Sequence, residues 1–194
     1  MKQLLFFLLF SILILTCACQ SKSSQANPLA GTKQIEAAAA EVSFSFTRLN
    51  GSASNQFAVW IEDSHGRHLK TLYAAGYTAK GGWKRRETSI PLWVKKSGLA
   101  NLTNAQIDTL TGATPKTGTL TYTWDGKDST GAPVTAGEYF LLLEGTLRWE
   151  NQVLYRAPIL LGKGEAAAEV SVEYKGDPGA DRRMIDDVRV KTLR

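Results

Sequence analysis

Short segments in which apolar and polar residues alternate run through most of the chain and constrain its fold more than any other feature. Val42, Phe44 and Phe46, for example, alternate with Ser43 and Ser45. A period of two places successive side chains on opposite faces, so each segment is expected to be a β-strand with one buried face. About 7–8 strands separated by turn residues predict an all-β fold, a single immunoglobulin-like β-sandwich. We expect these strands at residues 42–47, 56–62, 67–74, 88–94, 119–124, 138–147, 152–161 and 169–174.

Turn-forming residues separate the first strands. Residues 63–66, Asp-Ser-His-Gly, are typical of a turn, and they would make residues 56–74 a hairpin. Three glycines indicate a loop at residues 76–87. Pro91 has no backbone N–H to donate, so the strand at residues 88–94 is expected at a sheet edge.

One helix and the C-terminal boundary complete the expected organisation. Residues 102–110 predict a helical turn with Thr103 as its N-cap. The β-sandwich domain is expected to span residues 41–175. Residues 176–194 are expected to be a tail or an edge strand, with residues 186–193 the candidate strand.

The first residues are typical of an export signal. Lys2 is followed by an apolar run from Leu4 to Leu15, about the length of a signal-peptide core and too short to span a bilayer. Ala18 before Cys19 resembles a bacterial lipobox, in which the cysteine is lipidated and becomes the mature N-terminus. We therefore expect a lipoprotein signal peptide at residues 1–18 and a membrane anchor on Cys19, on a membrane surface rather than across it.

A polar segment follows this signal. Residues 20–28 are rich in serine and have no hydrophobic period, so residues 19–40 are expected to be a flexible tether. Cleavage after Ala26 by ordinary signal peptidase is the alternative, and it would leave no anchor. Lipidation is favoured because no cysteine follows Cys19, and an unpaired thiol on an exported protein would be a liability.

The charge of the chain excludes one class of partner. The formal net charge is +5, and the longest basic run is the three residues Lys84–Arg86. A run this short does not form the basic stripe that binds nucleic-acid phosphates. No nucleic-acid partner is expected.

The run from Trp124 to Tyr139, WDGKDSTGAPVTAGEY, resembles the immunoglobulin-like module of the flagellar hook-scaffolding protein. Asp125 and Asp128 can accept hydrogen bonds from nearby backbone N–H groups, and Gly131 supplies a conformation that side chains disfavour. A calcium site is the alternative interpretation of the two aspartates. It is disfavoured because no later acidic residue has EF-hand spacing.

A longer resemblance extends from about Phe44 to Tyr174. The segments FAVWIED, KTLY, GWKRR, PLW and DTLTGATP, in this order and spacing, resemble a family of predicted periplasmic domains catalogued as domain of unknown function 2271. The resemblance implies a β fold and a location in the cell envelope, in the periplasm. It implies no established activity.

Hydrolytic and metal chemistry have little support in the sequence. His65 and His68 are the only histidines, and both are expected to be solvated beside the hairpin turn. A nucleophile would need one of them buried beside a serine and a carboxylate, and no Gly-x-Ser-x-Gly occurs. We expect no catalytic residues, no metal site and no enzymatic activity.

A glycine-hinged loop carries an aromatic residue and three cations. Trp83, Lys84, Arg85 and Arg86 follow two glycines and could hold an anionic or aromatic ligand or a partner. The alternative, and the favoured one, is a surface loop with Trp83 folded over the core and solvated charges.

The run Asp-Thr-Leu-Thr-Gly-Ala-Thr that ends at Thr114 resembles the Asp-x-x-Ser/Thr-Gly-Ala-Thr motif modified by bacterial FMN transferases. The resemblance implies that Thr114 is the hydroxyl that accepts FMN through its phosphate and that Asp108 is the recognition carboxylate. It also implies that Thr111, Gly112 and Ala113 form a small, bendable approach to the acceptor. The cofactor implied is covalent FMN.

The chain departs from this pattern in three respects. Pro115 follows the acceptor, Thr117 replaces the usual later serine, and no dedicated FMN-binding domain is evident. The structural alternative is a tight loop leading into the strand at residues 119–124.

Together these observations predict a lipid-anchored periplasmic protein of the cell envelope. Its expected role is a noncatalytic accessory or electron-carrying subunit of a flavin-linked redox system, with an FMN transferase and a membrane redox protein as partners. The alternative is a cofactor-free β-sandwich module that binds or scaffolds in the envelope. Fold class cannot separate these two functions.

Overall fold

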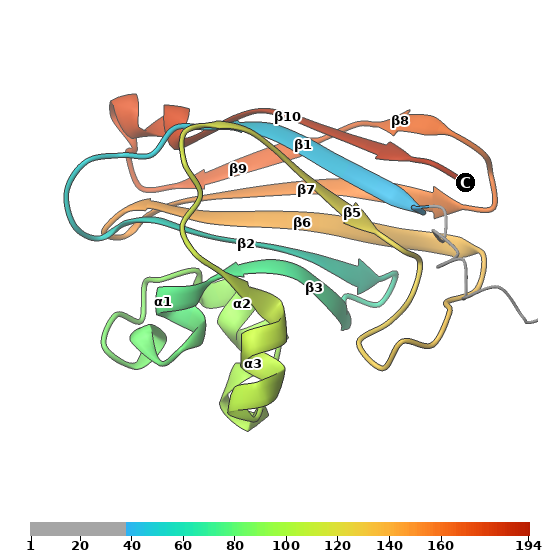
Figure 1. The fold of residues 1–194 in the computed structure, drawn as a ribbon. Coiled ribbons are helices and arrows are strands. Elements are labelled where there is room, and N and C mark those ends of the chain that lie inside the picture. Colours follow the sequence, from blue (N-terminus) through green and yellow to red (C-terminus); the bar gives the residue numbers. More distant parts are fainter. Residues whose placement is uncertain (1–37) are drawn as a thin grey trace, which may run out of the picture. The chain divides into compact units, whose positions relative to one another are not determined.

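The computed structural model describes residues 38–194, and the signal, anchor and tether predicted from the sequence lie outside these residues, apart from the tether's last three positions. The described chain contains ten strands in two sheets (Figure 1). The strands are β1 (Ala40–Phe46), β2 (Ser54–Asp63), β3 (His68–Ala75), β4 (Thr111–Gly112), β5 (Gly118–Trp124), β6 (Gly137–Arg148), β7 (Asn151–Leu161), β8 (Ala166–Ala168), β9 (Ser171–Lys175) and β10 (Ile185–Thr192). The helices are α1 (Gly76–Ala79), η1 (Gly82–Lys84), α2 (Pro91–Lys96), η2 (Leu99–Asn101), α3 (Asn104–Leu110) and η3 (Gly179–Met184).

The two sheets pack face to face, which confirms the all-β, sandwich-like prediction. One sheet has the strand order β5-β1-β10-β8, and the other has the order β4-β3-β2-β6-β7-β9. All neighbours pair antiparallel except β3 and β4, which are parallel. Seven of the eight expected strands form, and β10 occupies the candidate strand at residues 186–193. The other two strands, β4 and β8, have two and three residues and are too short to produce a hydrophobic period. No helix within residues 38–194 is long and apolar enough to cross a membrane.

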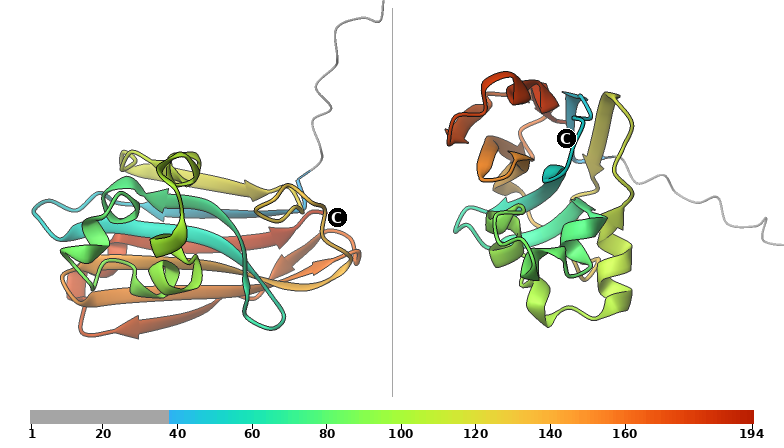
Figure 2. Two further views of the ribbon diagram at one scale, coloured as in Figure 1. Left: turned by 90° about the horizontal axis from the view of Figure 1, so that it is seen from below. Right: turned by 90° about the vertical axis from the view of Figure 1, so that its left-hand side faces the viewer.

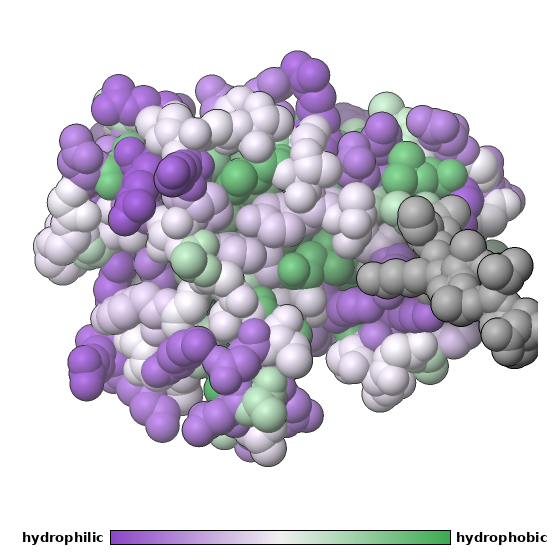
Figure 3. Space-filling view, viewed as in Figure 1, coloured by the Kyte–Doolittle hydropathy of each residue, from purple (hydrophilic) through white to green (hydrophobic). Residues whose placement is uncertain are grey.

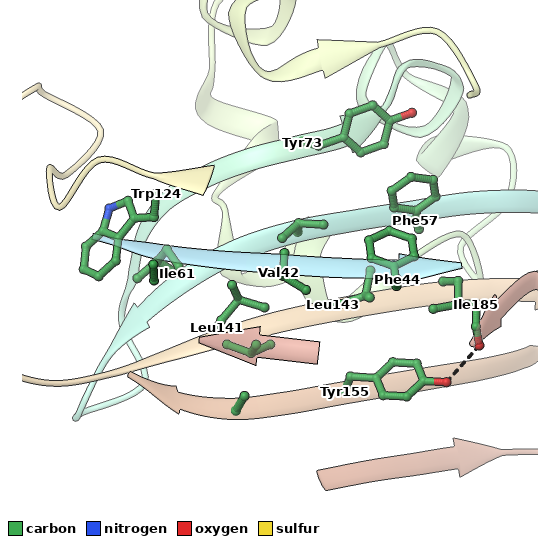
Figure 4. Close-up of a cluster of buried hydrophobic side chains, with 14 of the residues drawn as sticks. Val42, Phe44, Phe57, Ile61, Tyr73, Trp124, Leu141, Leu143, Tyr155 and Ile185 are labelled. Carbon is green, nitrogen blue, oxygen red and sulfur yellow. Dashed lines mark hydrogen bonds between the residues drawn. The ribbon is translucent and has the colours of Figure 1, made fainter. Parts of the chain in front are cut away.

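The core between the sheets is built by the alternating residues. Val42, Phe44 and Phe46 of β1 are buried, as their period predicts. The ring of Phe57 stacks on that of Tyr73 with centroids 4.6 Å apart (Figure 4). Tyr155 is buried in the same core and satisfies its hydroxyl by donating to the carbonyl of Ile185 at 2.9 Å. The hydroxyl therefore adds a directional contact between the two sheets.

A second core lies on the outer face of the six-stranded sheet. The segment between β3 and β4 folds into α1, η1, α2, η2 and α3, and these helices cover that face (Figure 2). Trp60 of β2, Leu142 of β6, and Ile90 and Trp93 of the helical segment are buried together there. Every residue of β2 is buried as a result. The chain is therefore layered as sheet, sheet and helices.

The prediction of an edge strand at residues 88–94 is wrong, because α2 begins within this segment, at Pro91. Ile90 takes a left-handed conformation (φ 42°, ψ 58°), and Pro91 then occupies the first helical position, where its missing N–H leaves nothing unsatisfied. Trp93 is fully buried against the sheet. A proline suits a strand edge and a helix start equally, and packing decided between them.

Two further predictions need correction. The expected loop at residues 76–87 contains two short helices, α1 and η1. Residues 185–192 form β10, which lies between β1 and β8, so this strand is neither a tail nor an edge. The helical turn predicted at residues 102–110 is confirmed as α3 (Asn104–Leu110), and Thr103 caps it in a reciprocal capping box with Gln106.

Candidate functional site

The segment that resembles the flavinylation motif links the two sheets. Its first three residues, 108–110, are the C-terminal end of α3, and Thr111–Gly112 then form β4 beside Ala74 and Ala75 of β3. The chain next crosses the edge of the sandwich without regular structure and enters β5 of the other sheet (Figure 1). Thr114 lies in this crossing, at the edge of the sandwich.

Gly112 has a structural reason to be glycine. A Cβ atom at this position would lie 2.8 Å from the Tyr73 ring, closer than real Cβ contacts. The Tyr73 hydroxyl donates to the carbonyl of Ala113 at 3.2 Å, which holds the crossing segment against the sheet. Burial raises the pKa of Tyr73 to about 12, so the hydroxyl keeps its proton and remains a donor. Packing therefore explains Gly112 without any cofactor.

The acceptor predicted from the sequence is accessible. Ala113 is exposed and Thr114 is half-buried. Among residues 38–194, no group forms a hydrogen bond with the Thr114 hydroxyl. Its hydroxyl is therefore not needed to hold the segment in place, unlike that of Thr117, which accepts the N–H of Arg48 at 2.9 Å.

Asp108 lies on the solvent-facing side of α3. Its carboxylate pairs with Lys80 Nζ at 2.6 Å, and both side chains are more than half exposed. An exposed pair of this kind contributes little to stability, so the carboxylate can exchange Lys80 for another partner. The geometry is suitable for a recognition residue that contacts a second protein.

The four residues of the glycine-hinged loop separate into two groups. Lys84 Nζ lies 5.5 Å from the centre of the Trp83 ring, and Arg85 is exposed. Arg86 instead turns away and donates through Nη2 to the carbonyls of Ala53 and Trp149, the latter at 3.3 Å. Arg86 thus joins the β1–β2 loop to the β6–β7 turn and is not available to a ligand.

Trp83 and Lys84 line a hollow of about 480 Å³ together with Lys80 and Asp108. Part of its lining is apolar, because Leu99 and other side chains of the outer core also line it. The loop and the N-terminal half of the motif are therefore brought together, as a joint site requires. Neither Lys80 nor the apolar part of the lining was predicted from the sequence, since their positions depend on how α1 and η2 pack.

Tyr77 is a second residue that sequence reasoning missed. It is half exposed and lines an adjoining hollow of about 600 Å³ with Lys80, Lys84 and Arg85. Gly82 is required here because a Cβ atom would collide with the carbonyl and ring of Tyr77. In the space-filling view, hydrophilic residues predominate over the helical layer, and hydrophobic ones show only as separated spots (Figure 3).

A separate cleft lies on the other side of α3. It has a volume of about 420 Å³, and its lining includes His68 and Lys70 of β3, Gln106 and Leu110 of α3, and Ser129. His68 is half-buried and bonds the Thr71 hydroxyl through Nε2 at 2.8 Å, so the expectation of a solvated histidine is wrong for this residue. Burial lowers the pKa of His68, which keeps the ring neutral near pH 7.

The aspartates of the 125–137 turn are occupied by the protein itself. Asp125 accepts Lys70 Nζ at 2.9 Å, and Asp128 accepts the N–H groups of Thr130 and Ala132 at 2.8 and 3.0 Å. These bonds match the structural role predicted for the turn. Within residues 38–194, no group of three or more His, Cys, Asp or Glu side chains could hold a metal ion.

Comparison with known families supplies the remaining observation. Residues 39–179 match the model of a family described as "predicted periplasmic protein", domain of unknown function 2271. The chain belongs to this family. The DUF2271 match includes the helical layer, the Thr114 segment and both hollows, and it ends before β10. No curated protein and no solved structure matches the chain.

Membership of DUF2271 confirms the resemblance recognised in the sequence and places the chain in the periplasm. The hook-scaffold comparison rests on the 124–139 segment alone and stays a prediction. A catalytic constellation is not evident at the described site: the nearest imidazole, His68, lies in the cleft on the opposite side of α3 from the hollow beside Asp108.

Proposed function

We propose that this DUF2271 protein is a noncatalytic electron carrier of a periplasmic redox system, with FMN joined to Thr114 and a lipid anchor on Cys19. The proposal rests on the position of Thr114 and on its hydroxyl, which is unpaired in the described part of the chain. A motif that resembles a flavinylation sequence ends there, on an irregular segment at the edge of the sandwich. The hydroxyl has no hydrogen-bond partner in residues 38–194.

The residues around Thr114 fit a covalently attached group. The exposed Ala113 and the absence of a strand or helix from residue 113 to 117 leave room for a transferase to enclose the segment. Gly112 and Tyr73 hold its start firmly against β3, so the acceptor is presented from a rigid support. The bound flavin would supply electron transfer, and the protein would hold it at the membrane surface.

The attachment would be a phosphoryl transfer, with one phosphorus–oxygen bond formed and one broken. The Thr114 oxygen forms a bond to the FMN phosphorus, while the pyrophosphate bond of a flavin dinucleotide breaks and releases a nucleoside monophosphate. The hydroxyl proton passes to a base of the transferase. Asp108 would act in recognition, because its exposed carboxylate can leave Lys80 for a donor on the transferase.

Co-expression in the envelope with an FMN transferase tests the proposal. Wild type should gain the mass of FMN less one water and fluoresce in a denaturing gel. Thr114→Ala should lose both signals, while Thr121→Ala, an exposed threonine on β5, should keep them. A wild-type protein that stays unlabelled beside a labelled control substrate would refute the flavin assignment.

The anchor is tested separately. Cys19→Ser should abolish acylation and release the protein from the membrane fraction, and Cys17→Ser should leave acylation intact. Mass spectrometry of the mature N-terminus gives the outcome. A mature chain that begins at Asn27 would instead establish ordinary cleavage and a soluble periplasmic protein.

The second candidate is a cofactor-free binding module. The observation in its favour is the cleft beside His68, whose lining is mixed apolar and hydrogen-bonding and in which Lys70 is already neutralised by Asp125. Such a site favours a small neutral ligand. Unlabelled wild type in the transferase experiment would make this the better account.

A further inference from the structure

Two cations follow the paired ends of β1 and β5, close in the chain to Thr114. Strands β1 and β5 pair antiparallel, and their last pair is Phe46 with Gly118. Beyond this pair the two chains stay in contact, because the Arg48 N–H donates to the Thr117 hydroxyl at 2.9 Å. Extending the β1–β5 register by two residues would bring Arg48 opposite Lys116, which is two residues beyond Thr114.

Neither charge is neutralised by the protein. Arg48 and Lys116 are exposed, and neither forms an ion pair with any residue from 38 to 194. Like charges opposite each other on neighbouring strands are destabilising. By contrast, Arg148, the last residue of β6, forms an ion pair with Asp181, with 2.7 Å between Nε and the carboxylate. The Arg48–Lys116 pair is thus an uncompensated basic site.

Its distance from Thr114 suits a group attached to that residue. Two residues of extended chain span at most about 7 Å, and the flexible Lys and Arg side chains can cover this length. A phosphodiester on Thr114 would carry one negative charge between two cations. The cations suggested by sequence reasoning are less suitable, since Arg86 is engaged with backbone carbonyls.

We infer that Arg48 and Lys116 bind the phosphate that joins the flavin to Thr114. The inference rests on the proposed flavinylation and adds the residues that hold the phosphate. Binding the phosphate removes the repulsion between the two cations and restricts the tethered flavin. The pair is a binding site and takes no part in electron transfer.

A test on the labelled protein uses the double variant Arg48→Gln/Lys116→Gln. Its matched control is Lys95→Gln/Lys163→Gln, which removes two exposed cations elsewhere. In labelled wild type and control, the phosphodiester ³¹P resonance should be displaced from that of the proteolytic flavinyl peptide. In the double variant this displacement should disappear while the labelled mass remains. A resonance unchanged between wild type and double variant would overturn the inference and leave flavinylation intact.

A second arm needs no transferase. Thr114→Glu places a carboxylate where the phosphate would begin, and Thr114→Gln is its neutral counterpart. At low salt Thr114→Glu should melt several degrees higher than Thr114→Gln, and this gain should vanish in the Arg48→Gln/Lys116→Gln background. No gain in the wild-type background would overturn the site, whatever the outcome of labelling.

A phosphate could also come from lipid headgroups. Sedimentation of the unlabelled protein, without its acyl anchor, with phosphatidylglycerol vesicles distinguishes the sources. Equal sedimentation of the double variant and wild type supports the flavin phosphate as the ligand. Loss of vesicle binding in the double variant, but not in the control, would assign the cations to the membrane and overturn the inference.

Discussion

The carboxylate of Glu144, on β6, accepts the backbone N–H of Trp93, in the first turn of α2, at 2.7 Å. It also accepts the N–H of Leu92 at 3.0 Å. The other end of α2 is held similarly, because Lys96 Nζ pairs with the buried Glu62 of β2 at 3.3 Å. Two strands of the sheet thus fix both ends of α2, whose Trp93 is buried in the outer core.

Glu144→Ala should destabilise the protein by roughly 2–4 kcal/mol, because two N–H groups at a buried helix start lose their acceptor. Urea unfolding measures the change. Glu173→Ala, an exposed carboxylate on the neighbouring β9, should change the free energy of unfolding by less than about 0.5 kcal/mol. Equal effects of the two substitutions would show that Glu144 does not hold α2.

Glu144 should also make stability depend on pH. Burial raises its pKa from 4.5 to about 7, against the lowering effect of the Trp93 and Leu92 N–H groups. The folded state therefore holds the proton more firmly than the unfolded chain does. The stability that Glu144 contributes is complete below about pH 4.5 and is lost as the pH rises through about 7.

The comparison with Glu144→Gln isolates this effect. Between about pH 5 and pH 8 the stability of wild type relative to the variant should fall by on the order of 2 kcal/mol. His68 contributes the opposite slope, since burial lowers its pKa and its contribution is lost as the pH falls. This slope is common to both proteins and cancels in the difference. A difference that does not change with pH would contradict the raised pKa.

Gly112→Ala should cost about 1–3 kcal/mol, because the new Cβ atom would lie 2.8 Å from the Tyr73 ring and the ring or β4 must shift. Thermal unfolding measures it. Ala113→Ser, on the exposed neighbour, is the control and should melt like wild type. If Gly112→Ala melts like wild type but loses flavin labelling, the glycine serves the transferase and not the packing.

The glycines of the 125–137 turn should both resist substitution by valine. Gly131 has a φ of 87° and Gly137 a φ of 157°, and L side chains rarely adopt either conformation. Gly131→Val and Gly137→Val should each cost about 1–3 kcal/mol. Denaturant midpoints of the two variants measure the change. Two variants that unfold like wild type would contradict the turn conformation.

Asp108→Ala should reduce flavin labelling without unfolding the domain. The Lys80–Asp108 pair is exposed on both sides, so its loss should change stability by less than about 0.5 kcal/mol. Glu87→Ala removes another exposed carboxylate and should leave labelling at the wild-type rate. Labelled mass against time is the measurement, and equal rates for both variants would remove Asp108 from the recognition role.

Local sequence patterns predicted much of the fold. Strand β1 was predictable because its inner face is buried and its outer face is polar, and α3 was predictable because Thr103 and Gln106 form a capping box within four residues. The candidate acceptor Thr114 was likewise recognisable from a contiguous motif. Each of these signals lies within a few residues of chain, which is why the sequence contains them.

Tertiary structure decided the features that join distant segments. Residues 91–96 form a helix because Glu144, some fifty residues later in the chain, satisfies its first N–H groups and because Trp93 finds an apolar face on β2. Sequence alone determined that the chain is a β-protein, and it predicted an export signal and a modification motif at Thr114. Only the packing of sheets and helices determined that Arg86 is engaged, that Tyr77 and Lys80 line the hollows, and that Arg48 contacts Thr117 beyond the motif, since each depends on how distant segments of the chain pack together.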